Sequence, residues 1–373
     1  MRTKTALVAL LVVLAAGPAL AVGGVAGTSV DQTATAVADE HLDCEFPIEV
    51  EDATGETVTI EEEPEDVVVL GPNVAQHLWE IGAQEKVTGM PVNQFTAYLN
   101  GSTERTNVVG QFGQPVNEEV IALDADLVLA PNIISEDAVG ELRSSGETVY
   151  YYPVANDLDR MLQLVERTGQ LVGECEAATE KTDELAERIA LVEEAVADEE
   201  RPTVFYDLGD EPSGPFTVNS GALEHDVITT AGGENIAADV PADSGYPQIS
   251  TEVVVAEQPE WVIAPGNLST FAGYEETPAL ANDRVIEVDG NLISQHGPRN
   301  VDVLERIAEQ LHPEAVAAAR QAAEEDADGS MDDGMDDQST GDESDADDSG
   351  PGLTVGAAVA AVVALAFLAG RRE

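Results

Sequence analysis

One stretch of the chain occurs twice, and this duplication limits the possible folds more than any other feature. The first copy is Phe112–Pro131, the second is Tyr246–Pro265, and the two align without a gap. Each copy begins with an aromatic residue and ends with proline, and Glu118 in the first stands where Glu252 stands in the second. Two related units about one domain length apart predict two lobes of similar build that hold a ligand between them.

Each copy follows the pattern of a single α/β unit. After the aromatic loop comes a polar residue, Asn117 or Thr251, which we expect to cap a short helix that begins with an acid. A turn leads from this helix into an apolar run at residues 127–130 or 261–264, which is typical of a buried strand in a parallel sheet. The repeat therefore predicts an α/β fold.

The net charge of the chain is extreme. There are 73 acidic and 16 basic residues, which give a formal net charge of −57. The absence of a basic patch for phosphates argues against a nucleic-acid partner. A hydrated acidic surface keeps a protein soluble in high salt, where charge repulsion is screened, and this indicates a halophilic source. Binding of a cationic partner is the alternative interpretation.

Residues 1–26 have the pattern of a secretory signal peptide. Arg2 and Lys4 precede the apolar run Ala6–Ala16, and an Ala-x-Ala cleavage site follows. No cysteine comes directly after this run to accept a lipid. We therefore expect an exported protein that continues with a flexible segment at residues 27–43.

The C-terminal residues predict a tether to the membrane. Residues 316–350 form an acidic spacer that we expect to be disordered, and residues 351–373 contain the apolar run Leu353–Gly370 followed by two arginines. This run is long enough for a marginal transmembrane helix with its end in the cytoplasm. The Pro-Gly-Leu sequence before it resembles the archaeal PGF-type sorting signal, which implies removal of the helix and a lipid anchor. A retained helix is the alternative.

The folded body begins near Cys44, and its motifs resemble one known family. Phe46–Ile60 alternates apolar and polar residues around the turn DATG, as in a β-hairpin, and Val67–Leu70 and Val74–Ile81 predict a buried strand and a helix. DATG, EPEDVVVLGP, the two repeat copies and the closing GPRNVDVLERIAEQLHPEA are together similar to the class III solute-binding proteins of ATP-driven importers. The resemblance implies two Rossmann-like α/β lobes joined by a long helical linker.

We place the first lobe at residues 44–156, the linker at 157–200 and the second lobe at 201–315. The linker carries apolar residues at three- and four-residue spacing, as amphipathic helices do. Gly169 and Gly173 interrupt it, so that it forms either one helix or two. A stiff linker implies that the lobes close little around a ligand.

The chain has two cysteines, Cys44 and Cys175. In an exported protein two cysteines are expected to form a disulfide, and we predict this pair, which would join the start of the body to the linker. Because the bond closes a long loop, it should contribute about 4–5 kcal/mol to stability through chain entropy. Two free thiols are the alternative.

Motifs of enzymatic catalysis are absent from the sequence. It contains no nucleophile elbow, zinc-protease helix, phosphate loop or paired-cysteine motif. A metal carrier would need three or four converging ligands, for which His77, His225 and His296 are the candidates. The alternative is that these histidines are structural. We expect neither a cofactor nor a bound metal.

Aromatic residues are few and indicate a ligand surface. Phe112 and Tyr246 hold equivalent places in the repeat, and flat apolar faces opposed across a cleft would hold a large planar ligand. The alternative is that such residues fill the base of each loop. The neighbouring loops add further candidates for ligand contact: Phe95, Tyr98, Phe271, Tyr274 and Arg299.

The resemblance to the solute-binding proteins implies a ligand and a partner. The match is closest to the cobalamin-binding branch, in which aromatics at the positions of Phe112 and Tyr246 line the corrinoid pocket. The family also implies that Glu118 and Glu252 bind arginines of a permease, which works with ATPase subunits. Each acid could instead only stabilise the start of its helix, and Glu119 is an alternative to Glu118.

Three other functions remain open at this point. A tyrosine and arginine cluster would suit a ferric siderophore or haem. A chelatase, which also uses two α/β lobes, would need a His–Glu pair in the cleft. A surface adhesin or zinc scavenger would fold in a metal-dependent way.

Overall fold

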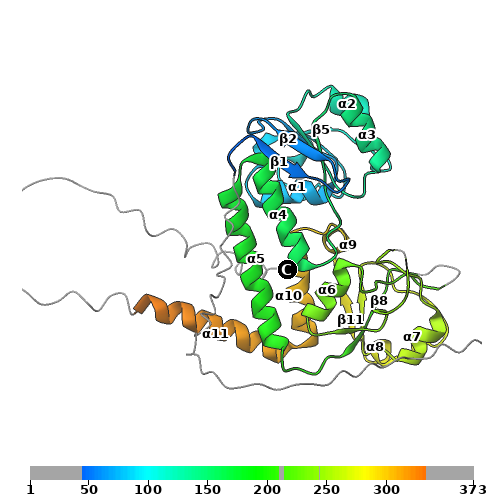
Figure 1. Ribbon diagram of the computed structural model, residues 1–373. Helices are drawn as coiled ribbons and strands as arrows, with labels where there is room; N and C mark the ends of the chain where they lie inside the picture. The colour runs from blue at the N-terminus through cyan, green and yellow to red at the C-terminus, as the bar shows by residue number, and fades with distance from the viewer. Residues whose placement is uncertain (1–43, 210–213, 243, 333–373) are drawn as a thin grey trace, which may run out of the picture. The chain divides into compact units, whose positions relative to one another are not determined.

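The computed structural model describes residues 44–209, 214–242 and 244–332. The signal peptide, the flexible segment at 27–43 and the apolar run near the C-terminus that we expect from the sequence lie outside these residues. Figure 1 labels the elements of the described part, which contains two separate parallel sheets and a two-stranded hairpin. In this part of the chain, no helix is both long and apolar enough to cross a bilayer.

The N-terminal hairpin is formed as predicted. Strands β1 (Ile48–Glu51) and β2 (Thr57–Ile60) pair antiparallel, and alternate residues of each are buried. The turn between them is fixed by Asp52, whose carboxylate accepts hydrogen bonds from the backbone amide and hydroxyl of Thr54. The hairpin also binds the first lobe, because Arg143 forms ion pairs with Asp52 and Glu56.

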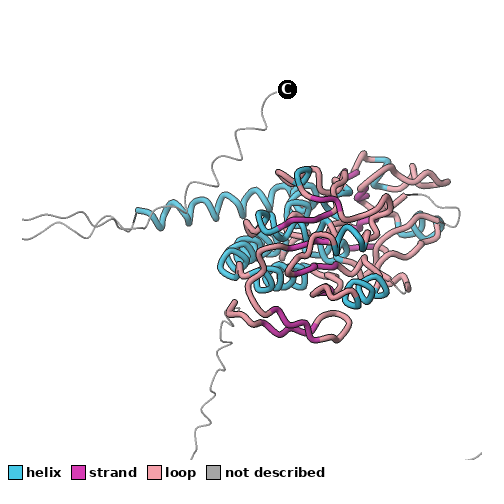
Figure 2. The backbone as a smooth tube through the Cα atoms, turned by 90° about the horizontal axis from the view of Figure 1, so that it is seen from above, coloured by secondary structure: helices cyan, strands magenta, loops and turns pink. Residues whose placement is uncertain are grey.

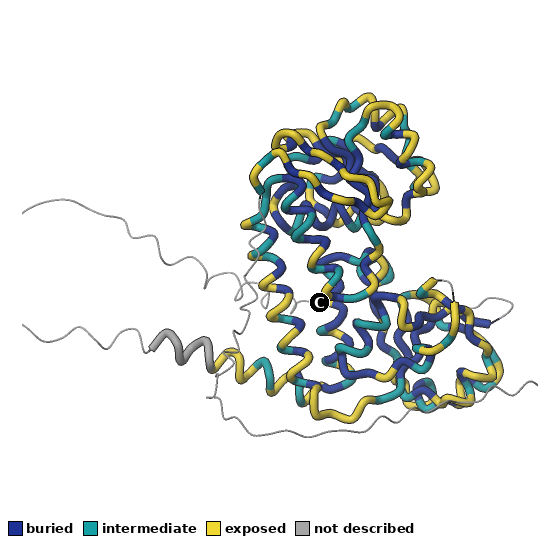
Figure 3. Tube along the Cα trace, in the orientation of Figure 1, coloured by how far each residue is buried: buried dark blue, intermediate teal, exposed yellow. Residues whose placement is uncertain are grey.

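The first lobe is built on a five-stranded sheet with the order β5-β4-β3-β6-β7, in which all neighbours are parallel. Its central strands are buried on both faces, as their continuous apolar sequences require (Figure 3). The strands are β3 (Val67–Val69), β4 (Val87–Met90), β5 (Thr106–Asn107), β6 (Leu127–Ala130) and β7 (Val149–Tyr151). The helices are α1 (Pro72–Glu80), η1 (Gln84–Lys86), η2 (Ser102–Glu104), α2 (Asn117–Ile121) and α3 (Glu136–Ser144).

The second lobe has a four-stranded parallel sheet with the order β11-β10-β8-β9. The strands are β8 (Thr203–Tyr206), β9 (Glu234–Asn235), β10 (Trp261–Ala264) and β11 (Val285–Glu287). The helices are α6 (Leu223–Thr230), α7 (Thr251–Glu257) and α8 (Pro278–Ala281). Short strands and helices alternate along the chain in both lobes, and Figure 2 distinguishes the two kinds of element by colour.

The two sheets confirm the internal repeat. The strand order is the same in both sheets: β4-β3-β6-β7 in the first lobe corresponds to β9-β8-β10-β11 in the second. Strand β5 is an additional edge strand of the first lobe. The match extends to the backbone of single residues. Asp124 and Gln258 follow the equivalent helices α2 and α7, and both have a φ angle of 49°. Because residues other than glycine seldom adopt this left-handed conformation, the two copies share the same unusual turn.

The predicted helix caps are wrong by one residue. Helix α2 begins after Val116, which offers no side-chain cap, while Asn117 donates instead to Glu141 of α3. In α7 the hydroxyl of Ser250 accepts from the amide of Val253, so that Ser250 takes the role that we assigned to Thr251. Each helix begins one residue before the acid at which we expected it to start, and Glu118 and Glu252 therefore remain in the first turn.

The linker consists of two helices, α4 (Leu158–Val172) and α5 (Cys175–Val196), which lie side by side (Figure 1). Gly173 separates them with a left-handed φ of 81°. Gly169 does not interrupt the helix but lies inside α4, where a Cβ atom would come within 2.3 Å of the Cβ of Ala178. This glycine therefore allows the two helices to pack closely. Helix α4 contacts α1 of the first lobe and α6 of the second.

The predicted disulfide is present. Cys44 and Cys175 are bonded across a sequence separation of 131 residues. The bond attaches the start of the hairpin segment to the first residue of α5. The whole first lobe thus lies within one covalently closed loop.

The C-terminal part of the body contains α9 (Gly290–Ile293), α10 (Asn300–Leu311) and α11 (Pro313–Asp332). We predicted disorder from residue 316 onward. For residues 316–332 this prediction is wrong, because they belong to α11. Its alanine-rich first half favours a helix, and Val316 is buried while Arg320 pairs with Glu309 of α10. Residues 333–350 of the predicted spacer lie outside the described residues.

Candidate functional site

Exposed apolar side chains gather on loops that follow the carboxyl ends of the strands. In parallel sheets with helical connections, this edge is where ligands bind. The large apolar side chains exposed on these loops are Phe95, Tyr98, Phe112, Ile133, Val154, Leu208, Phe216 and Tyr246. Leaving such side chains in water gives no folding energy, so their position indicates a binding surface.

Phe112 lies at the tip of a tight loop before α2. The loop is closed by a bridge between Val109 and Pro115, and Gly113 supplies the left-handed conformation that the turn needs, with φ 79°. The amide of Gly113 donates to the carbonyl of Gly110 at 3.1 Å. The Phe112 side chain is 87% exposed, so the loop holds this ring in solvent rather than against the lobe.

Tyr246, the counterpart of Phe112, is held by polar contacts. Its hydroxyl lies 3.0 and 3.1 Å from the two carboxylate oxygens of Glu224 and 3.2 Å from Nε2 of His296. Burial and the negative charge of Glu224 raise the pKa of Tyr246 well above its usual value. Tyr246 is nevertheless 38% exposed, so part of the residue remains in contact with solvent.

Residues 295–299, here named the bridging segment, connect the two lobes. The side chain of Gln295 accepts from the Tyr98 hydroxyl at 2.9 Å and donates to the carbonyl of Phe95 at 2.9 Å. The next residue, His296, contacts Tyr246 of the second lobe. Tyr98 and Tyr246 are thereby joined through two consecutive residues.

Gln76 and Arg299 complete the contact of the bridging segment with the first lobe. Gln76 donates to the Tyr98 hydroxyl at 2.8 Å and accepts from the Arg299 amide at 3.0 Å. The Arg299 guanidinium lies 4.4 Å from the centre of the Tyr98 ring, as in a cation–π pair. Gly297 is required here because a Cβ atom would come within 2.5 Å of the Gln76 side chain.

The structure does not bring all the predicted ligand contacts together. Phe95, Tyr98, Tyr246 and Arg299 meet around the bridging segment, whereas Phe112 has no direct contact with them among the described interactions. Tyr274 is only 1% exposed and donates its hydroxyl to the buried carboxylate of Asp207 at 2.9 Å. Its ring stacks on Phe271 at 4.3 Å, so that these two aromatics fill the base of their loop.

Glu118 and Glu252 occupy equivalent places at the starts of α2 and α7. Both side chains are exposed, and neither forms an ion pair within the described part of the chain. An exposed apolar residue accompanies each acid on its helix, Ile121 on α2 and Val253 on α7. These are the features that a contact surface for a partner protein needs, although each acid also stabilises its helix start.

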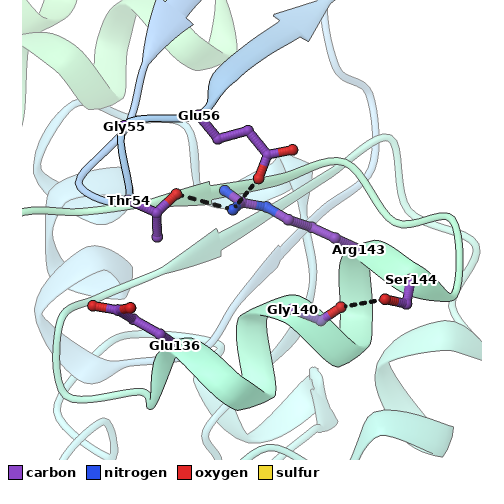
Figure 4. A pocket seen from close by; sticks show the side chains of 7 residues that line it. All are labelled: Thr54, Gly55, Glu56, Glu136, Gly140, Arg143 and Ser144. Carbon is purple, nitrogen blue, oxygen red and sulfur yellow. Dashed lines mark hydrogen bonds and ion pairs between the residues drawn. The ribbon is translucent and has the colours of Figure 1, made fainter.

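An open groove runs along the outer face of α3. The first of its three overlapping depressions has a volume of about 740 Å³ and lies between α3 and the hairpin (Figure 4). There Thr54 and Glu56 point toward Arg143, whose guanidinium donates a hydrogen bond to each of them. The last depression reaches Glu118 on α2. The groove is polar and shallow, and the exposed aromatics do not line it.

The three candidate metal histidines each have a different side-chain partner. His77 is buried and paired with Thr168, and His225 contacts Asn235, while His296 contacts Tyr246. In the described ranges, no cluster of three or more histidine, cysteine or acidic side chains is arranged to hold a metal.

Sequence reasoning missed Gln76, Glu224 and Gln295. Glu224 is one of 73 acidic residues, and nothing in its local sequence distinguishes it. His296 and Arg299, which the sequence singled out for other reasons, were the residues that pointed to the bridging segment. These residues gain their roles from contacts with distant parts of the sequence, which no local pattern reports.

The match with a known family covers most of the folded body. The model of the periplasmic binding protein family matches residues 67–292, which include both sheets and the linker. This chain is a member of the periplasmic binding protein family. The two-lobed α/β fold expected from the sequence is thereby confirmed.

Relatives of this periplasmic binding protein have been named for their ligands. The cobalamin-binding protein of Halobacterium salinarum is 38% identical over 304 residues, covering 77% of this chain and 80% of the relative. The vitamin B12-binding protein of Vibrio parahaemolyticus is 26% identical, and the match covers 71% of this chain and 95% of the relative.

Solved structures show the same fold at lower identity. The periplasmic vitamin B12 binding protein of Vibrio cholerae matches with a TM-score of 0.57 and 22% identity, over 69% of this chain and 98% of the solved chain. The periplasmic heme-binding protein of Roseiflexus matches with a TM-score of 0.58 and 20% identity, over 67% of this chain and 99% of the solved chain. Because these proteins carry different ligands on one fold, the fold alone does not identify the ligand.

Proposed function

We propose that this chain is the solute-binding component of an ABC importer and that it captures a corrinoid, cobalamin, outside the cell. The observation that carries the proposal is the meeting of Tyr98 and Tyr246 at the bridging segment. Their partly exposed rings come from different lobes and offer apolar faces to a large ligand. The 38% identity to a cobalamin-binding protein supports the choice of ligand.

Delivery to the importer would use the rim of both lobes. Glu118 and Glu252 are the proposed contacts for arginines of the permease, which works with ATPase subunits. We further propose that the protein is located outside the cytoplasm and is tethered by residues beyond the described helix α11. Membership of the periplasmic binding protein family supports the extracytoplasmic location.

The test is a titration of the purified protein with cyanocobalamin in high salt, followed by calorimetry and by the fluorescence of its two tryptophans. We expect one corrinoid to bind per chain, and we expect Phe112→Ala combined with Tyr246→Ala to abolish binding. Glu187→Ala on the exposed side of α5 is the matched control. Absence of cyanocobalamin binding by the unaltered protein would contradict the proposal.

An iron chelate is a second candidate ligand because of Arg299. Its guanidinium lies over the Tyr98 ring and forms no ion pair with an acid in the described part of the chain, so it could hold a carboxylate of haem or of a siderophore. Competition between haemin and cyanocobalamin measures this directly. Tighter binding of haemin, lost in Arg299→Gln, would favour the iron-chelate function.

A chelatase is the enzymatic alternative, and one observation requires that it be tested. His296 and Glu224 form a His–Glu pair with a separation of 3.5 Å. The relatives are named as binding proteins, which supports a binding role instead. Incubation with cobalt and a metal-free tetrapyrrole should yield no metallated product, and metallation that His296→Ala abolishes would favour the enzyme.

A further inference from the structure

Glu224 is a buried carboxylate with unusually few partners. Its side chain is 2% exposed and lies in the first turn of α6. Buried acids normally pair with a base. Among the described residues, no lysine or arginine lies within ion-pair distance of Glu224, and the His296 ring is its nearest basic group, at 3.5 Å. The start of a helix favours the charge but does not supply a full counter-ion.

The hydrogen atoms in this cluster can be assigned. Both oxygens of Glu224 lie within hydrogen-bond distance of the Tyr246 hydroxyl, which has a single proton to donate. The raised pKa of Tyr246 keeps this proton in place at neutral pH. The Glu224 carboxylate lies closer to this hydroxyl than His296 Nε2 does, at 3.0 Å against 3.2 Å, so we assign the proton to Glu224, and the oxygen of Tyr246 retains only its capacity to accept. A ligand that reaches this oxygen must supply a donor.

The bridging segment holds His296 in a fixed position beside this pair. His296 has a left-handed φ of 43°, which costs energy for a residue other than glycine. The flanking residues hold this conformation, because Gln295 is bound to Phe95 and Tyr98, and the amide of Gly297 donates to Asn300. The ring is thus fixed near Glu224 and Tyr246, with its side chain 21% exposed.

We propose that Glu224, acting through Tyr246 and His296, makes the site select neutral N–H donors and reject carboxylates. The inference rests on the proposed function and specifies its chemistry. A corrinoid carries neutral amide side chains around its ring, and their N–H groups complement an acceptor with a negative charge behind it. The carboxylates of haem would face Glu224 with like charge. Glu224 is a specificity-determining residue, whereas the aromatic rings supply most of the contact area.

The experiment compares cyanocobalamin with its monocarboxylic acids, in each of which one side-chain amide is replaced by a carboxylate. The unaltered protein should bind at least one of these acids about ten- to a hundredfold more weakly than cyanocobalamin. Glu224→Gln should remove most of this difference, because the neutral amide both relieves the repulsion and offers an N–H donor. Tyr246→Phe keeps the ring and loses the hydroxyl, so it should also reduce the discrimination. Glu257→Gln, an exposed change on α7, should leave the ratio unchanged.

The possible outcomes separate the inference from the proposed function. If the unaltered protein fails to bind cyanocobalamin, the proposed function and this inference are both wrong. If it binds cyanocobalamin and every monocarboxylic acid equally, or if Glu224→Gln weakens all of them by one common factor, only the inference is overturned. If Glu224→Gln does not fold, the ratio measured for Tyr246→Phe decides in its place.

Discussion

Phe112 is the most exposed of the large apolar side chains in the described residues, at 87%. A ring in this position contributes almost nothing to folding, because it stays in water in both the folded and the unfolded state. Its exposure makes it a candidate for contact with the proposed ligand. Tyr246, on the opposite lobe, has a partly exposed ring and a hydrogen-bonded hydroxyl.

Replacing Phe112 by alanine should separate binding from stability. We expect Phe112→Ala to change the free energy of unfolding by less than about 0.5 kcal/mol, as is usual for surface positions. Cyanocobalamin affinity should fall at least tenfold, since an aromatic face would be lost. Urea unfolding and calorimetry measure the two effects. Glu187→Ala, an exposed change on α5, should leave both unchanged, and a loss of stability in Phe112→Ala would show that the ring has a structural role.

His77 should make the protein sensitive to acid. Its ring is buried, and Nδ1 lies 3.0 Å from the hydroxyl oxygen of Thr168. Burial lowers the pKa of His77 to about 4. Between about pH 6.5 and pH 4 the unfolded chain therefore binds a proton that the folded protein does not, and stability falls as the pH falls.

The effect of His77 on stability is measurable by urea unfolding. By pH 4 its contribution should reach about 3 kcal/mol relative to neutral pH. The acid sensitivity should shrink by about this amount in His77→Asn, whose amide can still donate to Thr168. Equal acid sensitivity in both proteins would contradict the assignment, because the other titrating groups are common to both.

At the scale of elements, α2 and α7 form a matched pair. Each is a short helix that follows the carboxyl end of a strand, and each exposes one acid of its first turn at an equivalent position. A left-handed residue follows each helix, Asp124 after α2 and Gln258 directly after α7. A symmetric partner with two equivalent binding surfaces would fit such a pair.

Charge reversal on both helices should stop transport without affecting capture. We expect the double variant Glu118→Arg and Glu252→Arg to abolish corrinoid uptake by cells while its affinity for cyanocobalamin stays within about twofold of the unaltered protein. Uptake of labelled cobalamin and calorimetry measure these properties. Glu187→Arg, on α5, is the matched control for charge. Normal uptake by the double variant would contradict the proposed contact with the permease.

The sequence predicts the fold better than it predicts the site, for physical reasons. The repeat copies and the hairpin are readable because a strand or a turn depends on residues that are close in the sequence. Composition was misleading for α11, since its acids suggested disorder while its alanines favour a helix that packs on α5. The contact between Glu224 and His296 joins residues 72 positions apart, and no local pattern reports it.

At the scale of the whole molecule, the disulfide is the strongest single constraint. Removing it with Cys44→Ala and Cys175→Ala should lower the free energy of unfolding by about 3–5 kcal/mol, because the unfolded chain regains the freedom of a long loop. Urea unfolding with and without reductant provides the measurement. The double variant should not respond to reductant. A difference below about 1 kcal/mol would mean that the unfolded chain is already compact.

The same bond determines how the protein would respond to mechanical tension. Force applied between the start of the hairpin segment and helix α11 would pass from Cys44 through the sulfur atoms directly into α5. The first lobe lies outside this path and would carry no load, so the second lobe would yield alone. In a single-molecule pulling experiment, reduction should lengthen the fully extended chain of 131 loop residues by about 450 Å. The loops of the first lobe, including the one that carries Phe112, would then be shielded from the applied load.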